Sequence, residues 1–406
     1  MWEQDIGVFP VRFRDQGDEF AHHVSAEFGD PRFMAATGSN GSSPVELGPP
    51  LSGEVGSKLV IRSHEGGIAC TVAGDSGPAS VEEVEPWRRA VQAAVEALGR
   101  RDRVFVWEAI ISTYPGPLGL DRVGALAGLR DLGPVALAPG EVLMREFVPT
   151  RERLDHGPGV RHTFPLIASG AVRSYAWDPV VSAAHRDLRR ACGLLSLVTG
   201  KLWIPRTYPA HRTENSERLC VPVVVGPSGE SFPGEADWDG EVPVDAETFE
   251  LPEWAVRAWQ ILDADPELDT AVGAHYEALR LQAHGHPSLA HLAFVTAIEG
   301  YGMRLVPNAP CRCHAECTHP KGVATARFRR ALKTVMTQKE VKQLAGVAYD
   351  LRSFTGHRGT LFGSEHTFGF WPMSLFKPGD DSLFDLQMVG ELRHASRQVL
   401  TKALNG

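Results

Sequence analysis

The 406-residue sequence has few cysteines and no long apolar run, and both absences limit what the protein can be. Of its six cysteines, three fall within seven residues beside histidines, so a network of disulfide bonds is not expected. No stretch approaches the roughly 18 uninterrupted apolar residues that a membrane-spanning helix needs. The chain begins Met-Trp-Glu-Gln-Asp, without the basic and apolar regions of a secretory signal. We therefore expect a soluble cytoplasmic protein that does not associate with membranes.

Acidic residues outnumber basic ones along most of the chain, whereas basic residues are in excess near its end. The formal net charge is −9, yet the segment from Lys321 to Gly406 holds 13 Lys or Arg against seven Asp or Glu. This asymmetry predicts that a polyanion would bind at the basic tail. The alternative is a solvated helix surface without a partner, because most charge runs are no more than that.

The first 226 residues alternate between short β-type runs and amphipathic helices. Runs rich in β-branched and aromatic residues, bounded by Gly, Pro, Asn and Asp, predict strands at Val8–Phe13, Lys58–Arg62, Ile68–Val72, Val104–Ser112, Val142–Val148, Thr163–Trp177 and Val221–Val225. Apolar residues at helical spacing predict helices at Val81–Leu98 and Pro179–Thr199. We interpret residues 1–226 as a mixed α+β region that serves as a sensor or specificity domain.

A change of pattern follows at residues 227–253, which hold nine carboxylates and no Lys or Arg. Such an acidic Pro- and Gly-bearing segment is expected to be a linker. Residues 254–406 then show helical periodicity, and we predict an all-α antiparallel bundle. The expected helices are Trp254–Leu262, Leu268–Gln282, Ser288–Leu305, Val323–Met336, Glu340–Arg352 and Leu383–Leu404.

An arginine and a histidine stand five positions apart where the predicted helix Glu340–Arg352 ends. The run from Leu351 to Gly359 places Arg352 and His357 just ahead of a turn. RNA cleavage needs such a pair, because a ribose 2′-hydroxyl must lose a proton and attack the adjacent phosphate. Histidine can move that proton near neutral pH. Arginine can bind the phosphate bidentately and stabilise the charge that develops on it.

This run resembles the Arg-x(4–6)-His motif of HEPN domains, and in particular the ApeA-like branch. The resemblance covers about Ser288–Leu404, in which the segment Phe294–Glu299 looks like the early HEPN helix that often carries a Glu. It implies a homodimer that cleaves RNA without a metal, as in toxins and antiviral defence effectors. Carried over to this chain, Arg352 orients the scissile phosphate, His357 acts as acid and base, and Glu299 is a candidate for orienting both.

Ser353 departs from the pattern, because active members of the family commonly place Asn, Asp or His directly after the Arg. A non-catalytic HEPN module that binds RNA or protein, or that dimerises, therefore stays open as an alternative. Basic residues of the predicted helix Val323–Met336 and the residue after His357 are the expected RNA contacts, namely Arg327, Arg329, Arg330, Lys333 and Arg358.

A cluster of thiols and imidazoles lies within the predicted helical domain, at residues 311–319. Zinc favours four such ligands in a tetrahedron. The candidates are Cys311, Cys313, His314, Cys317 and His319, with His366 as a possible ligand from elsewhere. We expect a structural zinc site rather than a catalytic one, since so many side-chain ligands leave no open position. A zinc-stabilised regulatory protein without an RNA role, or free thiols in a surface loop, are the other interpretations.

Overall fold

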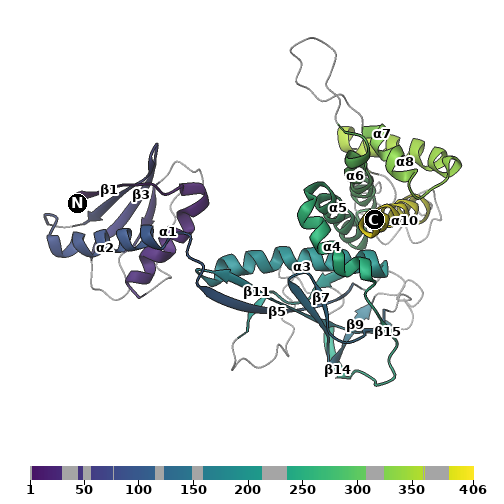
Figure 1. The fold of residues 1–406 in the computed structure, drawn as a ribbon, viewed down its shortest axis with the longest axis horizontal. Helices are drawn as coiled ribbons and strands as arrows, with labels where there is room; N and C mark the ends of the chain where they lie inside the picture. Colours follow the sequence, from purple (N-terminus) through teal and green to yellow (C-terminus); the bar gives the residue numbers. More distant parts are fainter. Residues whose placement is uncertain are drawn as a thin grey trace, which may run out of the picture. The chain divides into compact units, whose positions relative to one another are not determined.

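The computed structural model describes residues 2–29, 44–48, 56–75, 77–114, 123–148, 159–212, 236–307, 324–359, 361 and 384–406. Strands and helices are both present, and helices make up most of the described residues of the C-terminal half (Figure 1). By internal contacts the chain divides into two compact units. The first comprises Met1–Phe105 with Arg173–Val180, and the second comprises Val106–Val172 with Val181–Gly406.

The first unit is built on a four-stranded antiparallel sheet with the strand order β1–β4–β3–β2. Leu59 pairs with Val72 and Ile61 with Cys70, and these four side chains share one buried core with Trp87 of α2. Because alternate residues of a strand point to the same face, α1 and α2 must cover the same face of this sheet. The elements are β1 (Trp2–Phe9), α1 (Phe13–Glu27), β2 (Val45–Leu47), β3 (Lys58–His64), β4 (Gly67–Gly74) and α2 (Val81–Ala97).

The start of the chain differs from the sequence-based expectation of a strand at Val8–Phe13. The strand β1 instead ends at Phe9, and Phe13 already begins α1. Pro10 follows β1 directly, and a proline cannot donate a ladder hydrogen bond, so the strand stops there. The predicted helix Val81–Leu98 is confirmed as α2, where the Ser80 side chain accepts a hydrogen bond from the backbone N–H of Glu83 at the N-cap.

Among the described residues, the strands from residue 103 onward form three further sheets. The largest has six strands in the order β12–β5–β11–β8–β7, with β13 also paired to β5. A second sheet has the order β10–β9–β14, and β6 pairs with β15 in parallel. The bounds are β5 (Arg103–Thr113), β6 (Ala125–Leu126), β7 (Arg130–Leu132), β8 (Val135–Pro139), β9 (Val142–Val148), β10 (Gly159–Thr163), β11 (Leu166–Ser174), β12 (Trp203–Pro205), β13 (Ala210–His211), β14 (Ala236–Glu241) and β15 (Thr248–Phe249).

The acidic segment 227–253 is not where the chain divides into its two units. Its described residues include β14, which pairs with β9, and β15, which pairs with β6. The backbone of an acidic segment can join a sheet while its carboxylates point to solvent. The predicted strand Val221–Val225 lies outside the described residues.

Helices dominate the described residues from 253 onward; the bounds of α4, α5 and α6 lie within two residues of the predicted ones, whereas α7 ends earlier and α8 ends later than predicted. They are α4 (Glu253–Ala264), α5 (Pro266–Ala283), α6 (Pro287–Leu305), α7 (Ala324–Leu332), α8 (Gln338–Arg358), a π-helical segment (Phe384–Val389) and α10 (Gly390–Asn405). The central helix is α6, which contacts α5, α7, α8 and α10. Its fully buried side chains include Phe294, Val295 and Ile298. None of the helices in the described part of the chain is long and apolar enough to cross a membrane.

A long helix, α3 (Trp177–Thr199), follows β11 in the sequence, and its C-terminal end contacts α10. It begins at Trp177, the residue at which the sequence predicted a strand to end. Side chains of α10 bind its last carbonyls: Arg397 donates to Leu197 and Val198 at 2.7 and 2.6 Å, and Arg393 donates to Gly200. The final carbonyls of a helix lack partners within it, and a nearby cation is favoured there.

Candidate functional site

The helix α8 carries both Arg352 and His357. It begins after Thr337, whose hydroxyl and backbone N–H exchange hydrogen bonds with Glu340 in a capping box. These hydrogen bonds lower the pKa of the Glu340 carboxyl. The helix continues to Arg358 and is followed by Gly359, at φ +64°. The predicted helix end at Arg352 was therefore too early, and the motif lies inside the helix rather than across its end.

Arg352 forms an ion pair with Glu299 of α6. Nη2 of the guanidinium lies 3.3 Å from Oε2 of the carboxylate. The two side chains are 24% and 13% exposed, so the pair is partly shielded from solvent without being sealed. The resemblance had given Glu299 as a candidate for orienting the motif, and the structure brings it into contact with Arg352.

Two polar atoms of this pair lack a partner. Oε1 of Glu299 and Nε of Arg352 are buried, and neither has a hydrogen-bond partner among the described residues. Nearly all buried polar groups in folded proteins are satisfied, so an exception calls for an explanation, such as a role in binding or catalysis. An anionic ligand that reached the guanidinium would find an unused donor there.

Tyr349 lies on α8 one turn before Arg352 and contacts the same pair. Cζ of Arg352 is 5.6 Å from the centre of the Tyr349 ring. The hydroxyl interacts with Glu299 and with Thr325 of α7, and burial raises the pKa of that hydroxyl above its usual value. The sequence reasoning missed Tyr349. The signal that would have found it is the i, i+3 spacing, which puts it on the same helix face as Arg352.

His357 is exposed, and its side chain leaves α8 in a different direction from that of Arg352. Five residues of α-helix correspond to a rotation of about 140° and a rise of about 7.5 Å. Its neighbour Gly356 lies against α6, since a Cβ there would be 3.7 Å from Leu292. Ser353 is half-buried. Within one chain, Arg352 therefore faces α6 while His357 faces solvent.

The predicted RNA contacts fall into two groups. Arg329, Arg330 and Lys333 are exposed on α7 and the turn after it. Arg327 is half-buried, and its Nε donates to the carbonyl of Val306 at 2.9 Å, just beyond the end of α6. That bond gives Arg327 a structural use. Arg358 is exposed at the end of α8.

The predicted zinc ligands at residues 311–319 lie outside the described residues, and so does His366. Among the residues that the structure describes, no group of three or more His, Cys, Asp or Glu could hold a metal ion. That finding bears only on the described ranges, so the zinc site stays a prediction.

Two buried histidines in the C-terminal helices were not singled out from the sequence. His275 of α5 shares a 2.8 Å hydrogen bond with the Ser396 hydroxyl of α10. Burial, together with Arg393 and Arg397, lowers the pKa of His275 to about 3. Burial also lowers the pKa of His291 on α6 to about 4. Both rings are therefore neutral at physiological pH and belong to the core.

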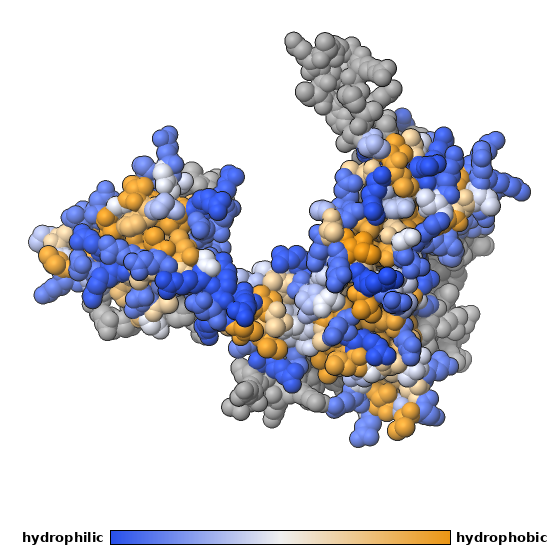
Figure 2. Space-filling view, viewed as in Figure 1, coloured by the Kyte–Doolittle hydropathy of each residue, from blue (hydrophilic) through white to orange (hydrophobic). Residues whose placement is uncertain are grey.

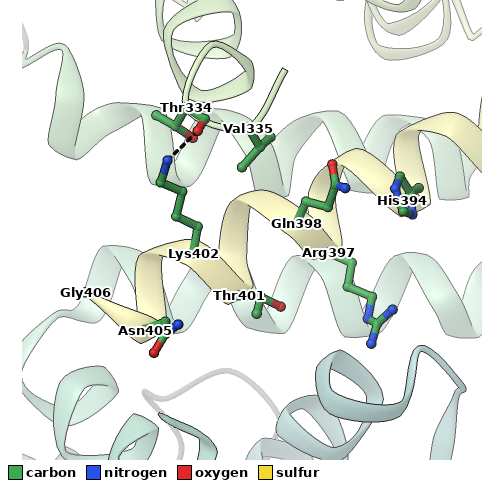
Figure 3. Close-up of a pocket in the computed structure, with 9 residues that line it drawn as sticks. All are labelled: Thr334, Val335, His394, Arg397, Gln398, Thr401, Lys402, Asn405 and Gly406. Atoms are coloured by element: carbon green, nitrogen blue, oxygen red, sulfur yellow. Dashed lines mark hydrogen bonds between the residues drawn. The ribbon is translucent and has the colours of Figure 1, made fainter. Parts of the chain in front are cut away.

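A surface hollow of about 800 Å³ lies between α10 and the turn that joins α7 to α8 (Figure 3). Polar side chains line most of it, and Lys402 donates to the carbonyl of Thr334 there. It lies near the N-terminal end of α8, whereas Arg352 and His357 lie near the other end. With its 21 residues, α8 is about 30 Å long, so the hollow is separate from the motif.

Comparisons with known proteins do not assign this chain to a family. No family model matches it, and neither a curated protein nor a solved structure shows a significant match.

Proposed function

We propose that the C-terminal helices form an all-α bundle of the HEPN type and act as a metal-independent endoribonuclease in the cytoplasm. The observation that carries the proposal is the Arg352–Glu299 pair. It holds a guanidinium in a fixed, half-buried place, with its Nε unused by the described residues, on the helix that also bears an exposed histidine. The N-terminal α+β part would then sense a signal or select the RNA, as in a toxin or an antiviral defence effector.

The chemistry assigns a separate task to each residue. His357 takes the proton from a ribose 2′-hydroxyl and later returns a proton to the departing 5′-oxygen. Arg352 binds the phosphate and stabilises the charge that grows on its oxygens. Glu299 keeps the guanidinium in place. The products are a 2′,3′-cyclic phosphate and a 5′-hydroxyl, and this route needs no metal.

A homodimer would bring an arginine and a histidine together, although Arg352 and His357 point in different directions within one chain. If two copies of α8 faced each other across a two-fold axis, the exposed histidine of one copy would approach the arginine of the other. Apolar side chains are available for such a contact, because Leu289 of α6 is 39% exposed and Val347 of α8 is 51% exposed. Figure 2 shows apolar residues among hydrophilic ones over the C-terminal helices.

RNA would dock on the basic side chains of α7 and the turn after it. Arg329, Arg330 and Lys333 are exposed, and no carboxylate lies between them in the sequence. Phosphate contacts of this kind position a nucleic acid without reading its sequence.

A non-catalytic HEPN module that binds RNA is the second candidate. Two observations favour it: Ser353 stands where active members of the family carry a more polar or charged residue, and Arg352 is already engaged by Glu299. A zinc-stabilised regulatory protein without an RNA role rests on the Cys/His cluster alone.

The test uses the full-length protein and total RNA in a buffer with EDTA. Wild type is compared with His357→Ala, with Arg352→Ala, and with His394→Ala as a control. His394 is an exposed histidine on a neighbouring helix, so its loss should leave cleavage intact. Removing a general acid–base group typically slows a reaction by about 10²–10⁴-fold, and we expect losses of this order from the first two substitutions.

Cyclic-phosphate ends on the wild-type products would identify the chemistry, and light scattering of the same samples would report whether the protein is a dimer. Retained RNA binding without cleavage would favour the non-catalytic module. Loss of folding on chelation, without any affinity for RNA, would favour the zinc-stabilised regulator. Cleavage that survives both substitutions would exclude this motif as the active site.

A further inference from the structure

Among the residues that the structure describes, Tyr349 is the aromatic side chain that contacts the guanidinium of Arg352, and three helices fix its position. Its ring packs against Phe328 of α7 with the ring centres 6.0 Å apart, and Phe328 is fully buried. Its hydroxyl interacts with Thr325 of α7 and with Glu299 of α6. A ring tied to α6, α7 and α8 at once has little freedom to move.

The guanidinium is therefore held from two sides. Glu299 engages Nη2 at 3.3 Å, and the Tyr349 ring lies 5.6 Å from Cζ, within the range of a cation–π contact. An arginine side chain has many rotamers, and each constraint removes some of them before a ligand arrives. Preorganisation of this kind favours a reaction more than an added contact with the substrate does.

The hydroxyl of Tyr349 has a second use. When a phosphate draws Arg352 toward itself, Glu299 loses part of its partner, and a half-buried carboxylate without a partner is unfavourable. The neutral phenol already interacts with that carboxylate, and it can remain a hydrogen-bond donor to it when the guanidinium moves away. Burial raises the pKa of Tyr349, which keeps the phenol protonated.

We propose that Tyr349 is a positioning residue for Arg352: its ring supports the guanidinium, and its hydroxyl compensates Glu299 when Arg352 binds phosphate. This inference rests on the proposed ribonuclease function. Tyr349 takes no proton from the substrate and need not touch it.

The experiment separates the ring from the hydroxyl. Tyr349→Phe keeps the ring and removes the hydroxyl, whereas Tyr349→Leu removes both. Tyr301→Phe serves as the matched control, because Tyr301 is a half-buried tyrosine on α6. Steady-state cleavage of one RNA oligonucleotide gives kcat and KM for each full-length variant. We expect Tyr349→Leu to lower kcat about tenfold with a smaller change in KM, Tyr349→Phe to lower kcat about threefold because only the hydroxyl is lost, and Tyr301→Phe to match wild type.

A second readout does not depend on cleavage. The Nε–H resonance of Arg352, assigned by its absence in Arg352→Lys, should carry a ring-current shift in wild type and in Tyr349→Phe, and should lose it in Tyr349→Leu. In the double variant Tyr349→Leu/Arg352→Lys, the loss of activity should be no greater than in Arg352→Lys alone, because both act through one group.

The outcomes are distinguishable. An unchanged resonance in Tyr349→Leu, or an unchanged kcat once the resonance has moved, would overturn the role of Tyr349 and leave the proposed function standing. A wild-type protein that shows the ring-current shift but cleaves no RNA would overturn the proposed function, and the catalytic role of Tyr349 with it. Additive losses in the double variant would mean that Tyr349 acts independently of Arg352, against the proposal.

Discussion

The C-terminal helices hold polar side chains both in the core and on the face where α6 meets α8, and these side chains differ in charge and exposure. In the core, His275 and His291 are fully buried, and burial keeps both rings neutral. On the face where α6 meets α8, Glu299 and Arg352 are charged and partly exposed, and each has a buried atom that no described residue satisfies.

This difference shows that residue type alone does not identify a site. The sequence has 16 histidines. Among the described ones, His275 and His291 have the most strongly lowered pKa values, and both lie in the core. A binding site needs polar atoms that remain available to a ligand. The core leaves no such atoms accessible, whereas the pair on the α6–α8 face is partly exposed. Paired substitutions, one from each place, test this distinction.

The largest effect is expected from Phe294→Ala in the core of α6. Phe294 is fully buried and lies against His275, with ring centres 5.5 Å apart. Truncating a buried phenylalanine typically lowers the free energy of unfolding by about 3–5 kcal/mol. Thr296→Ala, two residues further and exposed, should change it by less than about 0.5 kcal/mol. Denaturant titrations compare the two, and equal effects would contradict the assignment of core and surface.

A smaller loss is expected when the arginine that binds the end of α3 is replaced. Arg397→Met removes the guanidinium that donates hydrogen bonds to the carbonyls of Leu197 and Val198, which should lower the free energy of unfolding by about 2 kcal/mol. The matched variant Arg329→Met removes an exposed arginine of α7 and should leave stability unchanged. A thermal-shift series at constant salt would detect the difference. An Arg397→Met protein as stable as wild type would show that the hydrogen bonds from Arg397 to the end of α3 do not stabilise the fold.

The pH dependence of stability should follow the buried histidines. Their folded-state pKa values, about 3 for His275 and about 4 for His291, lie below the usual 6.5. Between the folded-state pKa and 6.5, the unfolded chain binds protons that the folded chain does not. The stabilising contribution of the neutral rings is therefore complete above pH 6.5 and is lost as the pH falls toward the folded-state pKa values. Each ring contributes a slope of up to about 1.4 kcal/mol per pH unit.

Unfolding measured between pH 7 and pH 5 tests this expectation. His275→Gln should flatten the slope, whereas His357→Gln, which changes an exposed ring, should leave it unchanged. A slope that responds to His357 and not to His275 would reverse the roles that we assign to core and surface.

The smallest change in stability is expected from Arg329→Ala/Arg330→Ala on α7, because both side chains are exposed. Their proposed role is to contact phosphate. RNA affinity should fall, and each lost contact should reduce the slope of log affinity against log salt by about 0.7 for single-stranded RNA. Filter binding at several salt concentrations gives that slope, and an unchanged slope would remove α7 from the proposed RNA path.

Much of the element order could be predicted because it rests on local patterns. Apolar spacing set the bounds of α5, α6 and α2 to within a few residues, and the strand at Val142–Val148 is the predicted one. The end of α8 could not be predicted, because Ser353, Thr355 and Gly356 are weak helix formers. Packing overrides that preference: Thr355 is buried, and Gly356 lies against α6.

The candidate site was predictable only in part. The sequence indicated Arg352, His357 and Glu299 through a resemblance, and the contact between Arg352 and Glu299 depends on how α6 and α8 pack. The part played by Tyr349 also depends on Phe328 and Thr325 of α7, which lie more than 20 residues away in sequence. The core histidines escaped notice because nothing local distinguishes a buried histidine from an exposed one.

The hydrogen bonds from α10 to the end of α3 join residues 193–200 positions apart in the chain. Contacts between residues so far apart in the sequence form late in folding, because a long segment of chain must be ordered before they can form. During synthesis, α3 would leave the ribosome long before the arginines that bind its last turn, and α6 would wait for the same helix to cover it. The core of the C-terminal helices therefore cannot be completed until translation has passed α10, so any function that depends on this core begins only after that point.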